Sequence, residues 1–325
     1  MTDMTTRLAG LSPEKLKLLA REIKKRNAEL RNQPDAGGVP ASVLAPIRTA
    51  GTNPPLFLAH PVGGGVIAYH DLAKYLRAEQ PVYALQNLDS SDEDEQKPLR
   101  IEDMAARYIE AIKTVCPDGP YLLGGSSMGG TVAFEMGVQL RAQNRPVSLI
   151  AMLDTPARVI PHMTGQEGHS PLAVELATLA SIIASGYRKQ CQLSLADLDV
   201  LKPEEQIHSV FHQLQQQQLI SANSSSSAFR IALMAFVKNL NALEKYVPRT
   251  YDGEVAIVRA QDTSSNMKET AGELSDDPTY GWQAYCTQPV KVRFVPGDHV
   301  QMNLEPHVRL TGAELQRFLD EAREN

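Results

Sequence analysis

Short apolar segments alternate along most of the chain with longer segments in which apolar residues recur at helical spacing. The short segments are typical of buried strands, and the longer ones of helices that cover a sheet. This alternation predicts an α/β fold with a mostly parallel central sheet and helices on both faces. The expected strands are residues 56–59, 81–85, 121–124, 148–153, 255–259 and 290–295, and the expected core helices are residues 66–76, 101–115, 131–141 and 306–321.

The alternation stops between residues 156 and 247. The segments 172–184, 203–218 and 228–246 all have helical spacing, and no strand pattern separates them. An all-helical insertion of this length between two strands of an α/β sheet is typical of a lid over an active site. We therefore predict a helical lid at about residues 156–247.

The first part of the chain has a different pattern. Ser12 and Pro13 form a helix start, and the apolar residues that follow fall near one face, opposite a basic side. Residues 32–55 are rich in Pro, Gly and Asn, which predicts an extended linker. The expected organisation is an N-terminal amphipathic helix and interdomain linker over residues 1–42, followed by an α/β domain over residues 43–325.

Composition excludes several classes of protein. The chain has 325 residues and a net charge of −6, without a block of Lys and Arg that would favour nucleic acid or an anionic membrane as a partner. No apolar run approaches the roughly 20 residues of a membrane span, and residues 1–10 lack the apolar core of a signal peptide, so the expected location is the cytoplasm. The 3 cysteines are isolated and lack metal-ligand spacing, so we expect neither a disulfide nor a metal site.

A glycine-rich turn lies between a predicted strand and the helix after it, with the sequence Gly125-Ser126-Ser127-Met128-Gly129. It fits the G-x-S-x-G pattern in one frame only, because the residue two places after Ser126 is Met128 and not glycine. Such a turn holds its central serine at strained backbone angles and needs small neighbours where strand and helix approach each other. Ser127 is therefore the candidate nucleophile, and the Met128 backbone N–H is a candidate oxyanion donor.

Two further polar residues follow predicted strands. Asp154 comes directly after one strand, and His299 lies just beyond the last strand. Ligands gather at the carboxyl ends of strands in open parallel sheets, so both residues should lie on the same rim as Ser127. The chain order Ser, Asp, His is that of α/β-hydrolases. Asp262, which follows the first strand after the lid, is the alternative acid.

These residue types define a set of chemical roles. His299 would take the Ser127 proton as general base and return it as general acid, while Asp154 would orient the imidazole and stabilise its charged form. The glycine-rich loop at residues 60–65 would supply a second oxyanion donor, for which the Val62 backbone N–H is the candidate.

Several motifs together resemble the thioesterase domains that end nonribosomal peptide synthetases and polyketide synthases. They are the run 55–64 with Tyr69 and Asp71-Leu72-Ala73, the segments 125–130 and 132–136, Leu153-Asp154-Thr155, Tyr280-Gly281-Trp282, and the segment 297–302. The similarity extends from about residue 43 to the C-terminus and is weakest across the lid. The chain thus resembles a C-terminal, type I thioesterase domain with an α/β-hydrolase fold.

The resemblance implies a covalent acyl-Ser127 intermediate and a peptide or polyketide chain delivered on the phosphopantetheine arm of an upstream carrier domain, with no cofactor bound by this domain itself. It also favours Asp154 as the acid, because the family places its acid after the strand before the lid. Release by water would give a free acid, and release by a nucleophile within the chain would give a macrocycle. The sequence leaves both outcomes open.

Two other functions are compatible with the pattern. One is a free-standing type II thioesterase that hydrolyses stalled acyl groups, although such proteins are usually shorter and have a smaller lid. The other is a non-catalytic α/β-hydrolase-like binding module, which the complete set of Ser127, Asp154 and His299 argues against.

Overall fold

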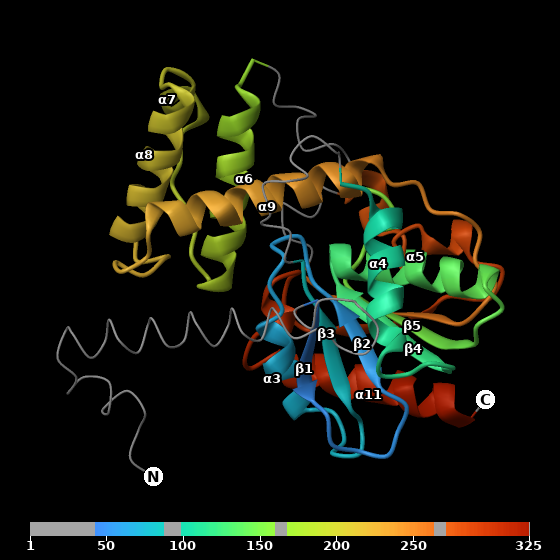
Figure 1. Ribbon diagram of the computed structural model, residues 1–325. Helices are drawn as coiled ribbons and strands as arrows, with labels where there is room; N and C mark the ends of the chain where they lie inside the picture. Colours follow the sequence, from blue (N-terminus) through green and yellow to red (C-terminus); the bar gives the residue numbers. More distant parts are fainter. Residues whose placement is uncertain (1–42, 88–98, 160–167, 263–270, 325) are drawn as a thin grey trace, which may run out of the picture.

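The computed structural model describes residues 43–87, 99–159, 168–262 and 271–324. The predicted amphipathic helix and the first part of the predicted linker fall in residues 1–42 and lie outside the described residues. The described part contains a twisted sheet with helices on both faces and a further group of helices beside it (Figure 1). This architecture agrees with the predicted fold class.

A seven-stranded sheet in the described residues has the order β1-β3-β2-β4-β5-β6-β7. β1 pairs antiparallel with β3, and every other neighbouring pair is parallel. β2, β4 and β6 are buried along their whole length, so neither face of these strands is exposed to solvent. The strands are β1 (Leu44–Arg48), β2 (Leu56–Ala59), β3 (Val82–Leu85), β4 (Tyr121–Ser126), β5 (Val147–Leu153), β6 (Val255–Ala260) and β7 (Lys291–Val295).

The strand order reverses at β2, which has β3 on one side and β4 on the other. Ligands of open α/β sheets bind at such a switch point, in the crevice outside the carboxyl ends of the strands. The loop 60–65 leaves the carboxyl end of β2, and Ser127 follows β4. The topology therefore places the predicted nucleophile and the predicted oxyanion loop side by side at the switch point.

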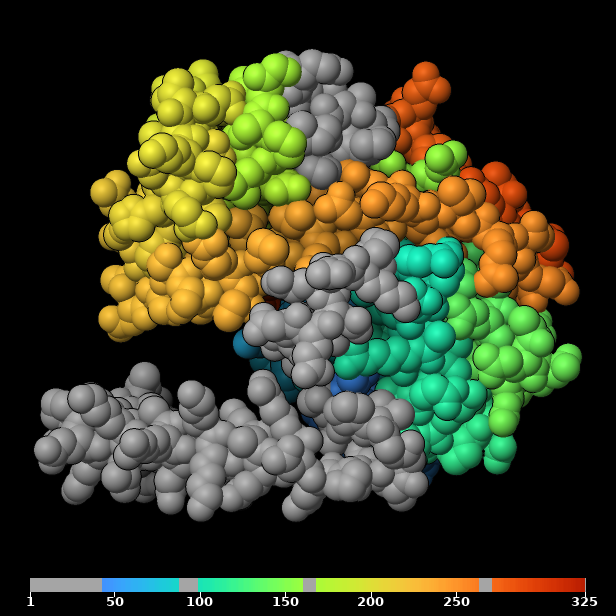
Figure 2. Space-filling view, turned by 45° about the horizontal axis from the view of Figure 1, so that its top comes forward, coloured from blue at the N-terminus to red at the C-terminus, as the bar shows by residue number. Residues whose placement is uncertain are grey.

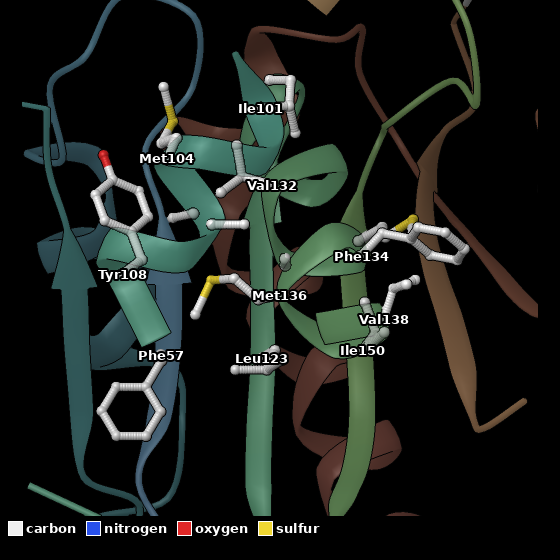
Figure 3. Close-up of a cluster of buried hydrophobic side chains, with 14 of the residues drawn as sticks. Phe57, Ile101, Met104, Tyr108, Leu123, Val132, Phe134, Met136, Val138 and Ile150 are labelled. Carbon is white, nitrogen blue, oxygen red and sulfur yellow. The ribbon is translucent and has the colours of Figure 1, made fainter. Parts of the chain in front are cut away.

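Helices cover both faces of the sheet. The helices α3 (Ala68–Lys74) and α11 (Val308–Glu324) pack on one face, and α4 (Ile101–Lys113) and α5 (Met128–Ala142) pack on the other. Figure 3 shows apolar side chains of α4 and α5 filling the space between these helices and the strands. Short 3-10 helices at Gly272–Asp276, Trp282–Tyr285 and Gln301–Asn303 interrupt the loops before and after β7.

The region predicted to be the lid consists of α6 (Pro171–Gly186), α7 (Leu195–Asp199), α8 (Pro203–Gln216) and α9 (Ser226–Lys245), and we refer to these helices as the lid. They share an apolar cluster that is separate from the two clusters of the sheet. The lid stands beside the sheet, with α9 running back across the molecule toward α5 (Figure 1), and it forms a continuous mass in the space-filling view (Figure 2). It therefore has a small core of its own.

The linker prediction for residues 32–55 was wrong where it overlaps β1. Pro46 lies in the middle of this strand, and a proline within an apolar run usually argues against a strand. Proline is tolerated here because β1 is at the edge of the sheet, and the strand register shifts between Pro46 and Arg48. The Arg48 guanidinium also fixes the strand, because it donates hydrogen bonds to the Ala73 carbonyl near the end of α3 and to the Arg77 carbonyl in the loop after α3.

Within the described ranges, no helix has both the length and the apolar character that a membrane span requires.

Candidate active site

Ser127 occupies a sharp turn between β4 and α5. Its backbone has φ 55° and ψ −125°, a left-handed region that costs a side-chain-bearing residue on the order of 1–3 kcal/mol. The turn is held by the Ser127 N–H, which donates to the Leu153 carbonyl at 2.9 Å, and by the Ser127 carbonyl, which accepts from Gly130 N–H at 2.9 Å. The side chain of Ser127 is only half-buried, in contrast to the residues around it.

The glycines of the motif are required by close backbone approach. A Cβ atom at Gly129 would lie 2.1 Å from the Ala59 carbonyl oxygen, and one at Gly125 would lie 2.6 Å from the same atom. Real side chains do not tolerate such distances. Both glycines thus allow the end of β2 to lie directly against the turn that carries Ser127.

Asp154 and His299 form a hydrogen-bonded pair. Asp154 follows β5 directly, also at positive φ (48°), and is 1% exposed. Its Oδ2 atom accepts from His299 Nδ1 at 2.8 Å, and its Oδ1 atom accepts from the Ala260 N–H at 3.0 Å. Because Nδ1 donates to the carboxylate, Nε2 is the ring nitrogen left to accept a proton.

The strand register places Ser127 next to this pair. Ser126 is the partner of Leu153 across β4 and β5, so Ser127 and Asp154 leave the sheet from adjacent positions. In the described part of the chain, no hydrogen bond joins the Ser127 hydroxyl to His299. Such catalytic hydrogen bonds are often long before substrate binds.

Asp262, the alternative acid, lies elsewhere on the rim. Its side chain is exposed, and its backbone N–H donates to the Gly297 carbonyl at 3.1 Å. The His299 ring donates its hydrogen bond to Asp154 and not to Asp262.

The loop after β2 carries the candidate oxyanion donor Val62. Ala59 pairs with Gly125 across β2 and β4, so the loop begins beside the serine turn. Met128, the other candidate donor, is the first residue of α5 and is fully buried. The Val62 carbonyl accepts from Asn239 Nδ2 on α9 at 2.7 Å.

Burial lowers the pKa of His60, in this same loop, to about 4. The His60 side chain is fully buried, and Nδ1 lies 2.7 Å from the Pro61 carbonyl, to which it donates. Its Nε2 atom has no hydrogen-bond partner among the described residues. His60 is therefore neutral at pH 7, and its buried ring makes an edge contact with the ring of Tyr108 on α4.

Two residues that support the site had no role in the sequence analysis. Thr155 Oγ1 donates to the Ser127 carbonyl at 2.9 Å, and Trp282 Nε1 donates to the Thr155 carbonyl at 2.8 Å. Both belong to motifs that carried the family resemblance, and this was the only signal for them. Asn239 was missed completely, although an asparagine at helical spacing from the apolar residues Phe236 and Leu243 could have drawn attention.

Among the described residues, no metal-binding group accompanies the candidate catalytic residues, and a cavity in the lid does not include them. The described residues contain no group of three or more His, Cys, Asp or Glu side chains that could hold a metal ion. A cavity of about 320 Å³ lies within the lid, where Gln192, Ser194, Asp197 and Ser209 are among its lining residues. None of the candidate catalytic residues lines it.

The sheet order, the strained serine after β4 and the acid–histidine pair at the carboxyl ends of later strands define an α/β-hydrolase fold. The family model for the thioesterase domain matches residues 54–311. The chain belongs to the thioesterase domain family.

Relatives of the chain include a nonribosomal peptide synthase and other large synthetases. A dimodular nonribosomal peptide synthase of Bacillus subtilis is 33% identical over 219 residues, which cover 67% of this chain and 9% of the relative. The malpibaldin synthetase of Mortierella alpina is 38% identical over 282 residues, which cover 85% of this chain and 4% of the relative. The chondramide synthase of Chondromyces crocatus is 28% identical over 293 residues, which cover 86% of this chain and 7% of the relative. The chain thus spans less than a tenth of the length of these relatives, and its resemblance to thioesterase domains of such synthetases is confirmed.

Solved structures support the same fold. The four-domain nonribosomal peptide synthetase holo-AB3403 matches with a TM-score of 0.72 and 25% identity, over 87% of this chain and 20% of that one. The Vlm2 thioesterase domain matches with a TM-score of 0.61 and 22% identity, over 86% of this chain and 98% of that one. At this identity the second likeness shows the fold alone.

Proposed function

We propose that this domain releases a peptide or polyketide chain from the phosphopantetheine thioester of an upstream carrier domain, through an acyl-Ser127 intermediate. The observation that carries the proposal is the hydrogen bond from His299 to the buried Asp154, beside the strained serine turn. The membership in the thioesterase domain family and the synthetase relatives support the substrate class.

In the first step, Ser127 Oγ attacks the thioester carbonyl while His299 Nε2 takes its proton. The carbonyl oxygen becomes an oxyanion, which accepts hydrogen bonds from the backbone N–H groups of Met128 and Val62. Collapse of this intermediate breaks the carbon–sulfur bond. The phosphopantetheine thiol leaves with the proton from His299, and the acyl chain stays on Ser127.

In the second step, a nucleophile attacks the acyl-Ser127 ester, and His299 removes the proton of that nucleophile before returning it to Ser127 Oγ. Water as the nucleophile gives a free acid, and a hydroxyl or amine within the acyl chain gives a macrocycle. Throughout, Asp154 holds the imidazole with Nδ1 toward the carboxylate, so that Nε2 faces the serine.

Turnover of acyl-N-acetylcysteamine thioesters by two serine variants tests the proposal. Ser127→Ala should abolish thiol release while the protein stays folded, and Ser126→Ala is the matched control that should retain turnover. Substantial thiol release by folded Ser127→Ala would overturn the proposal. Mass spectrometry of the product from a carrier-bound chain then separates hydrolysis from cyclisation, because the macrocycle is lighter by one water molecule.

A further inference from the structure

The helix α9 belongs to two apolar clusters at once. Phe229, Leu233 and Phe236 in its first part pack in the cluster of the lid. Ala242 in its last part packs in the cluster between the sheet and α4 and α5. In Figure 1, α9 accordingly runs from the other lid helices across to the region of α5. Asn239 lies at the junction between the two parts.

The end of α9 is fixed to the core by a buried carboxylate. Glu135 on α5 is fully buried and accepts hydrogen bonds from the Tyr246 hydroxyl at 2.9 Å and from Arg249 Nη2 at 2.6 Å. Tyr246 comes directly after α9, and Arg249 lies 4 residues beyond the last residue of the helix. Since the hydrogen bond of Tyr246 fixes the chain 4 residues beyond Ala242, the position of Asn239 relative to the core is defined.

Asn239 is fully buried and uses its side chain to bind the oxyanion loop. Its Nδ2 atom donates to the Val62 carbonyl at 2.7 Å, and its Oδ1 atom accepts from Asn87 Nδ2 at 3.4 Å. Burying an amide side chain destabilises the fold unless the amide is hydrogen-bonded. If position 239 served only for packing, an apolar residue there would be more stable. The residue type thus points to the contact with Val62.

The other described hydrogen bonds of this loop come from the core or from the loop itself. His60 N–H donates to the Leu85 carbonyl, and Gly64 N–H donates to the Pro61 carbonyl. Neither of these bonds reaches the peptide group between Val62 and Gly63, which Asn239 holds. The Val62 side chain also packs against both the core cluster and the lid cluster. Val62 is therefore the point where the lid touches the oxyanion loop.

We propose that Asn239 is a positioning residue for the oxyanion hole, through which the lid holds the loop so that the Val62 N–H is directed toward the carbonyl under attack at Ser127. This inference rests on the proposed function. It implies that the second oxyanion donor is in place only when α9 lies against the loop, so the position of the lid determines whether the acyl-transfer step is fast.

The test compares Asn239→Ala and Asn239→Asp with Asn241→Ala and Asn241→Asp. Asn241 lies on the same helix and is the matched control. Turnover of an acyl-N-acetylcysteamine thioester is measured per active site, counted by the fluorophosphonate that Ser127 binds. We expect kcat to fall about 10- to 100-fold in both Asn239 variants with little change in KM, since misplacement of a catalytic group by about 1 Å costs on that order. The Asn241 variants should match the wild type.

Inhibition by an alkyl boronic acid gives a second readout, because its adduct with Ser127 places an oxygen in the oxyanion hole. A positioning role predicts that the boronic acid binds the Asn239 variants more weakly in proportion to the fall in kcat, while the carboxylic acid product binds unchanged. The proposal is overturned if folded Asn239→Ala has wild-type kcat per labelled site, or if kcat falls equally in the Asn241 variants. A different result tests the proposed function itself: turnover by folded Ser127→Ala would contradict it, whatever the Asn239 variants do.

Discussion

Asp154 Oδ2 lies 2.8 Å from His299 Nδ1, although 145 residues separate the two along the chain. The contact forms because β5 and β7 flank β6, and each of the two residues lies just beyond the carboxyl end of its strand. The second Asp154 oxygen is bound by the Ala260 N–H at the end of β6 itself. The Asp154 carboxylate is thus held by two donors, the His299 ring and the backbone at the end of β6.

Replacing Asp154 tests which acid orients His299. Asp154→Asn should lower kcat by about 10⁴-fold, because an amide no longer selects the ring tautomer with Nδ1 protonated. Asp262→Asn, the matched control on the exposed part of the rim, should keep kcat near the wild-type value. Steady-state kinetics with the same thioester gives both values. A larger loss in Asp262→Asn than in Asp154→Asn would show that the assignment is wrong.

The close approach at Gly129 predicts a large difference between two glycine substitutions. Gly129→Ala would place Cβ 2.1 Å from the Ala59 carbonyl and push β2 away from α5, at about 3 kcal/mol or more. Gly186→Ala, at the last position of α6 with nothing within 4 Å of the added Cβ, should be neutral or stabilise by up to about 1 kcal/mol. Denaturant unfolding, followed by the fluorescence of the single tryptophan Trp282, measures both. Equal stability of the two variants would contradict the packing described for the turn.

The buried His60 predicts a pH dependence of stability. Its pKa falls from the usual 6.5 to about 4 on folding, so between these values the unfolded state binds the extra proton. The free energy of unfolding therefore decreases as the pH falls through this window, by about 3 kcal/mol in total for this residue, at about 1.4 kcal/mol per pKa unit. Above pH 6.5 the contribution is constant.

Unfolding curves between pH 7 and pH 4 test this with His60→Gln and His70→Gln. The His60 variant should lose less stability than the wild type as the pH falls across that range. His70 is exposed on α3, and its substitution should leave the pH dependence as it is in the wild type. An unchanged pH dependence in His60→Gln would mean that the ring is not buried in its neutral form.

Most of the fold could be predicted because buried parallel strands have a strong sequence signal. The segments that became β2, β4, β5 and β6 are mostly apolar, and their ends located Ser127 and Asp154. The edge strand β1 lacked this signal, because Pro46 and the prolines and glycines around it are typical of a linker. Its strand structure depends on pairing with β3, which no local pattern reveals.

The contacts that support the site could not be predicted from local sequence patterns. Asn239 meets Val62 across a separation of 177 residues, and nothing in the helical stripe of α9 indicates which loop it faces. The start of α5 was predicted at residue 131 instead of Met128, because the glycines after Ser127 disfavour a helix in isolation. In the structure, those glycines are needed where α5 touches the end of β2.

Labelling of the native protein by a fluorophosphonate tests the central claim most directly, since it reports whether Ser127 is an activated nucleophile. Mass spectrometry of the intact protein and of its peptides should find one phosphonyl group per chain, on the peptide that contains Ser127, and none in Ser127→Ala. A folded protein that turns over the thioester but carries no adduct on Ser127 would contradict the account.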